Sequence, residues 1–332
     1  MITDLLYGAI YCSLASLLYS SQISIELRLA SDEFIMPRIA LIGPGAIGGL
    51  VAAWLCQDDR NQVTVCARTP MQKLELETPD GLLKARPTVL TRPKGGHTVD
   101  WILVATKAYD SDSAAAWLSS LLGKDTRVAV LQNGVDHVER FSAYLPAERI
   151  LPVVVDCPTE RVSPERIRQR GPATLVVPSS QNGNAFTELF ARTEIDATTN
   201  TDFVTVAWRK LCINAAGAVN ALTMEPARIA HDPNAEMLMR KLVLEAVAVG
   251  RAEGAKLDDS IADEVVNHYK NVPGDSVNSL HADRLAGRPM EIDLRNGVIV
   301  RLGQRHGISA PCNEMAVALL KSVSPKQDNT HG

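Results

Sequence analysis

The sequence is poor in aromatic residues and its cysteines form no pattern. Six cysteines are spread over 332 residues without a CxxC pair, which favours reduced thiols in a cytoplasmic protein over the disulfide framework of a short secreted chain. Aromatic residues make up only 5%, so surfaces that stack the bases of single-stranded nucleic acid are not expected. The 34 Lys+Arg against 38 Asp+Glu give a net charge of −4, which provides no support for nucleic-acid binding either.

Grouped metal ligands and a long apolar run are also missing. The seven histidines are scattered without HxxxH or HxxE spacing, so we predict no metal site. The apolar run over residues 5–19 is shorter than the ~20 residues that cross a bilayer, and no Lys or Arg precedes it, as one would in a secretory signal. We therefore expect no stable membrane association. Residues 1–36 are interpreted as an N-terminal extension outside the catalytic fold, with an amphipathic membrane contact or an extra packing helix as alternatives.

From residue 38 onward, short apolar runs alternate with longer helical patterns. This alternation is typical of βαβ units and a parallel sheet. The expected strands are Arg38–Ile42, Gln62–Cys66, 100–106, 127–131, 150–156 and 173–177, and the expected helices are 46–56, 111–122 and 136–145. The Pro- and Arg-rich segment 158–172 is interpreted as a connecting turn region.

The pattern changes near residue 200, and only helical periodicity follows. Helices are predicted over 202–222, 235–253, 260–271, 291–306 and 312–323, separated by Gly and Pro residues. We therefore predict an α/β fold with a doubly wound parallel sheet over residues 37–200 and an all-helical domain over 201–325. A polar tail, 326–332, follows. The cleft between two such domains is the default place for a small ligand.

A glycine-rich loop joins the first expected strand to the first expected helix. Its residues are Gly43, Pro44, Gly45, Ala46, Ile47 and Gly48, and the GxGxxG spacing in a strand–turn–helix context is typical of a Rossmann-type dinucleotide site. There the first glycine permits a tight turn, the second lets the backbone approach a pyrophosphate, and the third lets helix and strand pack closely. The alternative is a glycine-rich helix cap with no ligand.

The end of the second expected strand indicates which dinucleotide is preferred. An NAD enzyme usually has Asp or Glu about 20 residues beyond the loop, where it binds the ribose 2′-hydroxyl. This chain has Arg68 there and no carboxylate before Glu75. Because a guanidinium pairs well with a phosphate, we predict NADP (NADPH) as cofactor. The alternative is that Arg68 is an ordinary solvated arginine.

Lys210 and Asn214 are candidates for the chemistry. Delivery of a hydride to a ketone creates a negative oxygen that needs a proton, and a buried lysine suits this role because desolvation lowers the pKa of an ammonium group. The two residues are four positions apart in the predicted helix 202–222, so they share one helical face. Taken alone, this pattern also fits a solvated Arg-Lys pair.

Five motifs occur in one order that resembles the ketopantoate reductase (2-dehydropantoate 2-reductase) family. The resemblance covers roughly residues 37–322, and the motifs are Gly43–Gly49, Thr106–Tyr109, Gln132–Gly134, Trp208–Asn214 and Gly287–Asp293. It implies an oxidoreductase acting on CH-OH donors, which reduces 2-dehydropantoate to (R)-pantoate with NADPH on the way to pantothenate and coenzyme A. The implied partner is a small 2-oxo acid.

The resemblance also implies roles for individual residues. Lys210 matches the family's catalytic lysine, the general acid, and Glu291 matches the acidic residue that supports it or the substrate hydroxyls. A charge at a helix N-terminus is the alternative reading of Glu291. The remaining matches concern binding: Asn133 beside cofactor and substrate, Lys107 near the cofactor phosphates or nicotinamide, Asn214 facing the substrate, and Ser279 on its carboxylate.

Two positions depart from the family pattern on the substrate side. Ala218 stands where a second asparagine is common, with Asn220 on a different helical face, and Ser276 also replaces an asparagine. These departures leave open a reductase of another 2-oxo acid or of an imine, and a non-catalytic NADP-binding sensor is the third alternative. Apolar helices of the second domain are compatible with a homodimer.

Overall fold

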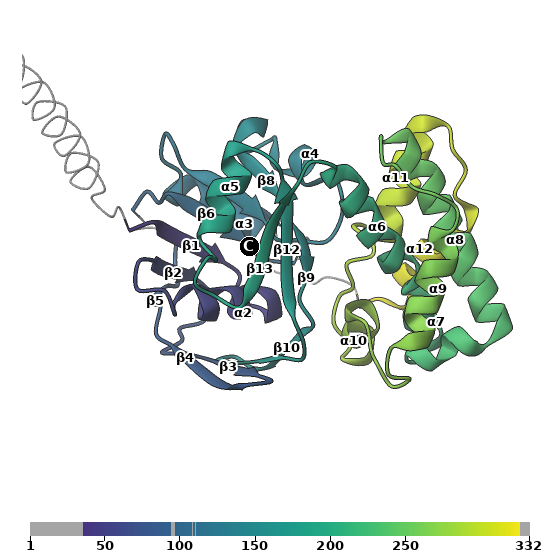
Figure 1. Ribbon diagram of the computed structural model, residues 1–332, viewed down its shortest axis with the longest axis horizontal. Coiled ribbons are helices and arrows are strands. Elements are labelled where there is room, and N and C mark those ends of the chain that lie inside the picture. The colour runs from purple at the N-terminus through teal and green to yellow at the C-terminus, as the bar shows by residue number, and fades with distance from the viewer. Residues whose placement is uncertain (1–35, 94–96, 108, 110, 326–332) are drawn as a thin grey trace, which may run out of the picture. The chain divides into compact units, whose positions relative to one another are not determined.

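The structure is a computed structural model that describes residues 36–93, 97–107, 109 and 111–325, and Figure 1 labels most of its elements. The predicted N-terminal extension, Met36 apart, and the predicted polar tail 326–332 lie outside these described residues. Of the described residues, Met36 and Pro37 belong to one unit and those from Arg38 onward to another. Every described helix and strand belongs to the second unit.

The predicted parallel sheet is confirmed. Six strands lie in the order β5-β2-β1-β6-β7-β8, and every neighbouring pair is parallel. The strands are β1 (Arg38–Ile42), β2 (Gln62–Cys66), β5 (Thr88–Leu90), β6 (Trp101–Val104), β7 (Arg127–Val130) and β8 (Ile150–Pro152). Because parallel strands end on the same side, the loops after β1, β2, β6 and β7 gather at one edge of the sheet.

Both faces of the sheet are covered, as the near-continuous apolar runs of a doubly wound fold require. In β1, Ile39 and Leu41 belong to the core on the side of α2 (Ala46–Leu55). Ala40 and Ile42 belong to the opposite core, which includes residues of α3 (Ser111–Leu121) and α4 (His137–Phe141). Successive side chains of a strand point to opposite faces, so one five-residue strand contributes to two cores.

The prediction of a turn region over 158–172 was wrong. The segment forms β10 (Thr159–Ser163) and β11 (Arg166–Gln169), which join a hairpin of β3 (Leu74–Thr78) and β4 (Gly81–Ala85) in the order β10-β11-β3-β4. Strand β11 pairs in parallel with β3, with Ile167 fully buried and Arg168 bound to Glu77. This distant pairing overrides the local turn signals.

The strand expected over 150–156 is divided in two. Strand β8 ends at Pro152, and β9 (Val154–Asp156) pairs with β12 (Ala173–Pro178) in a separate sheet of order β13-β12-β9. That sheet also contains β13 (Ile195–Asn200), which follows α5 (Gln181–Glu188). The chain changes sheets at Val153, whose amide still donates to the Val130 carbonyl.

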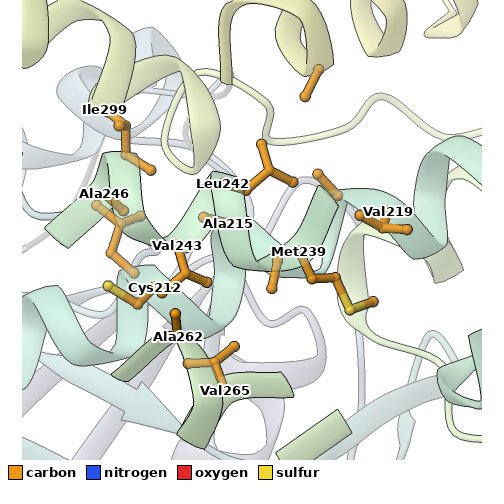
Figure 2. Close-up of a cluster of buried hydrophobic side chains, with 14 of the residues drawn as sticks. Cys212, Ala215, Val219, Met239, Leu242, Val243, Ala246, Ala262, Val265 and Ile299 are labelled. Carbon is orange, nitrogen blue, oxygen red and sulfur yellow. The ribbon is translucent and has the colours of Figure 1, made fainter. Parts of the chain in front are cut away.

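From Phe203 to the last described residue, 325, the chain contains helices and no strand, in agreement with the predicted all-helical part. These helices are α6 (Phe203–Ala216), α7 (Ala218–Thr223), α8 (Pro233–Ala252), α9 (Ile261–Asn271), α10 (Ser279–Leu285), α11 (Asn296–His306) and α12 (Pro311–Val323), with a short 3-10 turn, η3 (Ala227–His231). Figure 2 shows side chains of α6, α8, α9 and α11 meeting in one buried apolar cluster. None of the helices in the described ranges combines the length and hydropathy needed to cross a bilayer.

Two of the expected helices have different limits. The helix predicted over 202–222 is broken at Gly217, where a Cβ atom would lie 2.5 Å from the Tyr269 hydroxyl and 2.8 Å from Arg295 Nη2. The helix predicted over 291–306 begins at Asn296, because Arg295 has non-helical φ and ψ of −109° and −96°. Glu291 therefore lies in the turn before the helix and not in its first turn.

Candidate active site

The glycine loop has the geometry of a dinucleotide cradle. Gly43 has φ of +88°, and a Cβ there would lie 2.7 Å from the Thr106 side chain. A Cβ at Gly48 would lie only 2.2 Å from the Gly43 carbonyl oxygen, whereas one at Gly45 would meet no atom within 4 Å. The loop thus packs tightly against the residues that follow β6 and leaves space in front of the α2 N-terminus, where backbone N–H groups favour an anion. These residues fit a pyrophosphate.

Arg68 lies beside this cradle. The Gly43 amide donates to the Cys66 carbonyl over 3.1 Å, and Arg68 follows Cys66 by two residues, with an exposed side chain. Arg68 therefore follows the strand whose end contacts the glycine loop.

The loop after β7 is held to the loop after β6. Gln132 Nε2 donates to the Thr106 carbonyl over 2.9 Å, and Arg140 Nη1 donates to Gln132 Oε1 over 2.8 Å. Thr106 is also the residue against which Gly43 packs. A continuous set of contacts therefore connects the glycine loop to Asn133, which is the next residue after Gln132.

Lys107 is bound by two acidic side chains from the helical half of the chain. Its Nζ lies 2.9 Å from Glu291 Oε2 and 3.1 Å from Asp283 Oδ2. Both carboxylates are buried, and Lys107 is partly exposed. Burial acts to lower the pKa of Lys107, but the two carboxylates outweigh it and raise that pKa above its usual value. Lys107 is consequently charged at neutral pH.

Asn133 connects Glu291 to Asn214. Its Nδ2 donates to Glu291 Oε2 over 3.1 Å, and its Oδ1 accepts from Asn214 Nδ2 over 3.4 Å. Four of the residues singled out in the sequence, Lys107, Asn133, Asn214 and Glu291, therefore lie in one polar network.

Lys210 lies next to this network and has a different acidic partner. Its Nζ is 2.6 Å from Asp156 Oδ1 at the end of β9. Lys210 and Asn214 line the same pocket, as their spacing on α6 predicts, together with Asn133. The other lining residues are Gln132, Gly134, Val153, Val154, Val155, Ala207 and Leu211. The pocket thus combines an ammonium group and three side-chain amides with an apolar wall.

Ser279 is connected to the site through Arg295. Ser279 is exposed at the start of α10, and its Oγ accepts from Arg295 Nη1 over 3.2 Å. Arg295 Nη2 donates to the Asn214 carbonyl over 2.7 Å. Ala218, where the chain departs from the family pattern, is fully buried in the helical core and does not line the pocket.

Three polar residues of this region were missed in the sequence. Asp156 ends an expected strand, and the rule that ligands bind beyond the carboxyl ends of strands could have indicated it. Asp283 and Arg295 lie on either side of the motif Gly287–Asp293, outside it, and no spacing rule identifies them. Within the described part of the chain, no group of three His, Cys, Asp or Glu side chains could hold a metal ion.

Both parts of the chain match models of one protein family. Residues 39–182 match the family described as ketopantoate reductase PanE/ApbA, and residues 202–324 match the one described as ketopantoate reductase PanE/ApbA C terminal. The chain is 54% identical to a 2-dehydropantoate 2-reductase of Caulobacter vibrioides over 289 residues, which cover 87% of this chain and 100% of the relative.

A more distant relative and a solved structure agree. A 2-dehydropantoate 2-reductase of Mycobacterium tuberculosis is 38% identical over 288 residues, which cover 86% of this chain and 97% of the relative. The crystal structure of a PanE/ApbA family ketopantoate reductase from Ralstonia eutropha JMP134 matches with a TM-score of 0.79 and 30% identity. That match covers 86% of this chain and 98% of the solved chain.

Proposed function

The chain belongs to the ketopantoate reductase family, and from that membership we propose that it reduces 2-dehydropantoate to (R)-pantoate with NADPH as hydride donor. The observation that carries this proposal is the pocket that Lys210 and Asn214 share with Asn133. It brings a proton donor from the helical half next to a loop that is in contact, through Gln132 and Thr106, with the dinucleotide cradle.

Different residues of the site carry out proton donation and substrate binding in the proposed reaction. NADPH, when bound along the loop 43–48, supplies the hydride. Lys210 donates a proton from Nζ to the oxygen of the reacting carbonyl group, and it must leave Asp156 to do so. Asn214 and Asn133 donate hydrogen bonds inside the pocket, and Ser279 binds the substrate carboxylate.

The two acidic residues beside Lys107, Glu291 and Asp283, have a different role from that of Lys210. Glu291 accepts hydrogen bonds from Lys107 and Asn133, so it orients the amide that faces the pocket. Asp283 holds the same ammonium group from the other side. This arrangement favours a role for Glu291 in positioning the cofactor-side groups, since Lys210 is paired with Asp156.

The first test is turnover of 2-dehydropantoate beside a panel of other 2-oxo acids and imines, followed by the loss of NADPH absorbance. We expect kcat/KM for 2-dehydropantoate of about 10⁴ M⁻¹s⁻¹ or above, an ordinary value for an enzyme on its own substrate. Faster reduction of another acid or of an imine would support the mechanism but show that 2-dehydropantoate is not the preferred substrate. Tight NADPH binding without any turnover would instead identify a sensor.

The preference for NADPH is tested with Arg68→Ala. A charge-assisted hydrogen bond to phosphate contributes about 1.5–3 kcal/mol, so KM for NADPH should rise roughly ten-fold or more while KM for NADH changes little. Arg86→Ala removes an exposed arginine at the end of β4 and is the matched control. If Arg68→Ala raises both KM values equally, or neither, Arg68 does not read the 2′-phosphate.

We also propose a domain boundary, a cellular location and an oligomeric state.

We place the division between the dinucleotide-binding and catalytic domains at residues 200–201, between the end of β13 and the start of α6. The described cysteines are free thiols, which supports action in the cytoplasm. Exposed Met315 and Leu319 lie four residues apart on α12 and support a homodimer.

A further inference from the structure

Arg295 is a buried cation that the proposed reaction does not yet use. Only 2% of its surface is exposed, and within the described residues no ion pair joins it to a carboxylate. Its Nε atom is buried without a hydrogen-bond partner. Burial lowers the pKa of Arg295, and nearby Tyr269, Glu291 and Asp283 act against that shift. Burying a charge without a direct counter-ion costs free energy of folding. We therefore expect the Arg295 guanidinium to have a function that offsets this cost.

The contact with Arg295 determines how the Ser279 hydroxyl can form hydrogen bonds. A guanidinium has only donors, so in the 3.2 Å contact with Arg295 Nη1 the serine oxygen must be the acceptor. The hydroxyl hydrogen of Ser279 is then directed away from Arg295, and the serine is on the exposed side of this contact. Hydrogen bonding to a cation also makes the hydroxyl a stronger donor.

The same guanidinium fixes the position of α6. Arg295 Nη2 donates to the Asn214 carbonyl over 2.7 Å, and the absence of a side chain at Gly217 leaves the room that Nη2 occupies. The side chain of Asn214 lines the pocket and donates to Asn133. One cation therefore sets the distance between Ser279 and the pocket-lining face of α6.

We propose that Arg295 is a positioning residue for the substrate carboxylate: it occupies one acceptor site of the Ser279 oxygen and so directs the hydroxyl hydrogen toward that carboxylate. The proposal rests on the proposed function, because that function places the carboxylate of the substrate on Ser279. It extends that function by explaining how a neutral serine in the second half of the chain selects an anion.

The test is a double-mutant cycle of Arg295→Met and Ser279→Ala. Each single variant should raise KM for 2-dehydropantoate by about 10-fold or more, as expected for a lost hydrogen bond to a charged group. Because both substitutions remove the contact between Arg295 and Ser279, their effects should not be additive, and KM of the double variant should lie well below the product of the two single effects. KM for NADPH should stay unchanged, and Arg295→Lys should recover part of the loss.

The control is Arg284→Met. Arg284 belongs to α10 and donates to the carbonyls of Ala221 and Leu222, so its loss removes a structural arginine of the same region without touching Ser279. Thermal unfolding of all variants is measured in parallel. Additive effects of the two substitutions on KM, a matching rise in KM for NADPH, or the same KM rise in Arg284→Met would overturn the proposal. If Arg295→Met does not fold, Arg295→Gln takes its place in the cycle.

A binding measurement distinguishes a failure of this proposal from a failure of the proposed function. The same cycle is measured as Kd of (R)-pantoate with the oxidised cofactor present, which needs no turnover. A wild-type enzyme that binds pantoate with coupled Arg295 and Ser279 effects, but reduces another acid faster, disproves the substrate assignment alone. A wild-type enzyme that binds neither pantoate nor any 2-oxo acid of the panel disproves the carboxylate site.

Discussion

Replacement of Lys210 by alanine is expected to lower kcat by roughly 100-fold or more, because a general acid contributes about 10²–10⁴ to a rate. Lys210 lines the pocket with Asn214, and its Nζ is held 2.6 Å from Asp156. The alanine variant keeps the helix, since alanine is the best helix former. We therefore expect KM for NADPH and the unfolding temperature to change little, and steady-state kinetics with 2-dehydropantoate measures the loss.

Arg209→Ala is the matched control for this variant. Arg209 is the neighbouring residue on α6, and its guanidinium pairs with Glu264 of α9 at 2.5 Å. Exposed ion pairs of this kind contribute at most about 1 kcal/mol, so the control should keep nearly full kcat. A near-normal kcat in Lys210→Ala would remove Lys210 from the mechanism. A collapse in both variants would show that the helix itself, and not the ammonium group, had been damaged.

Gly48→Ala should weaken both the fold and cofactor binding. The added Cβ would lie 2.2 Å from the Gly43 carbonyl oxygen and 3.1 Å from Ala105 Cβ, so the backbone of the loop must move. Overpacking of this kind costs about 1–3 kcal/mol, and the moved loop no longer presents its N–H groups to a pyrophosphate. We expect a lower free energy of unfolding in denaturant titrations and a roughly ten-fold or larger rise in Kd for NADPH.

Gly45→Ala separates these two effects. A Cβ at Gly45 meets no protein atom within 4 Å, and the residue has φ of −73°, which alanine adopts without strain. This variant should keep its unfolding free energy and still bind NADPH less tightly, because the methyl group projects into the space left for the phosphates. If Gly45→Ala binds NADPH as the wild type does, the dinucleotide does not pass over that residue.

The sequence was most informative where packing is local. The first strand, Arg38–Ile42, and the helix after it were located correctly because their apolar residues and glycines reflect contacts within about 30 residues, as in a βαβ unit. The strand β11 was missed because it pairs with β3, whose partner residues lie 91 positions away. The only apolar residue among its four is Ile167, so no periodicity indicated it.

The candidate site shows the same limit. Motif spacing correctly grouped Lys210 and Asn214 on one face of α6, since that relation depends only on helix geometry. It did not indicate that Asp156 lies beside Lys210, or that Lys107 and Glu291 meet, because these pairs are separated by 54 and 184 residues. Which charges meet is decided by how strands and helices are assembled, and that information is not local.

Helix α6 belongs both to the candidate active site and to the helical core. Cys212 and Ala215 are fully buried among residues of α8, such as Leu242 and Val243, whereas Lys210 of the same helix faces the pocket. A helix moves as a nearly rigid body, and a close-packed interior transmits strain. Mechanical stress, pressure or heat that loosens the core between α6 and α8 would therefore displace Lys210, the proposed proton donor, although no residue of the pocket had been replaced. The position of Lys210 in the pocket therefore depends on how rigidly the apolar residues of α6 pack against α8.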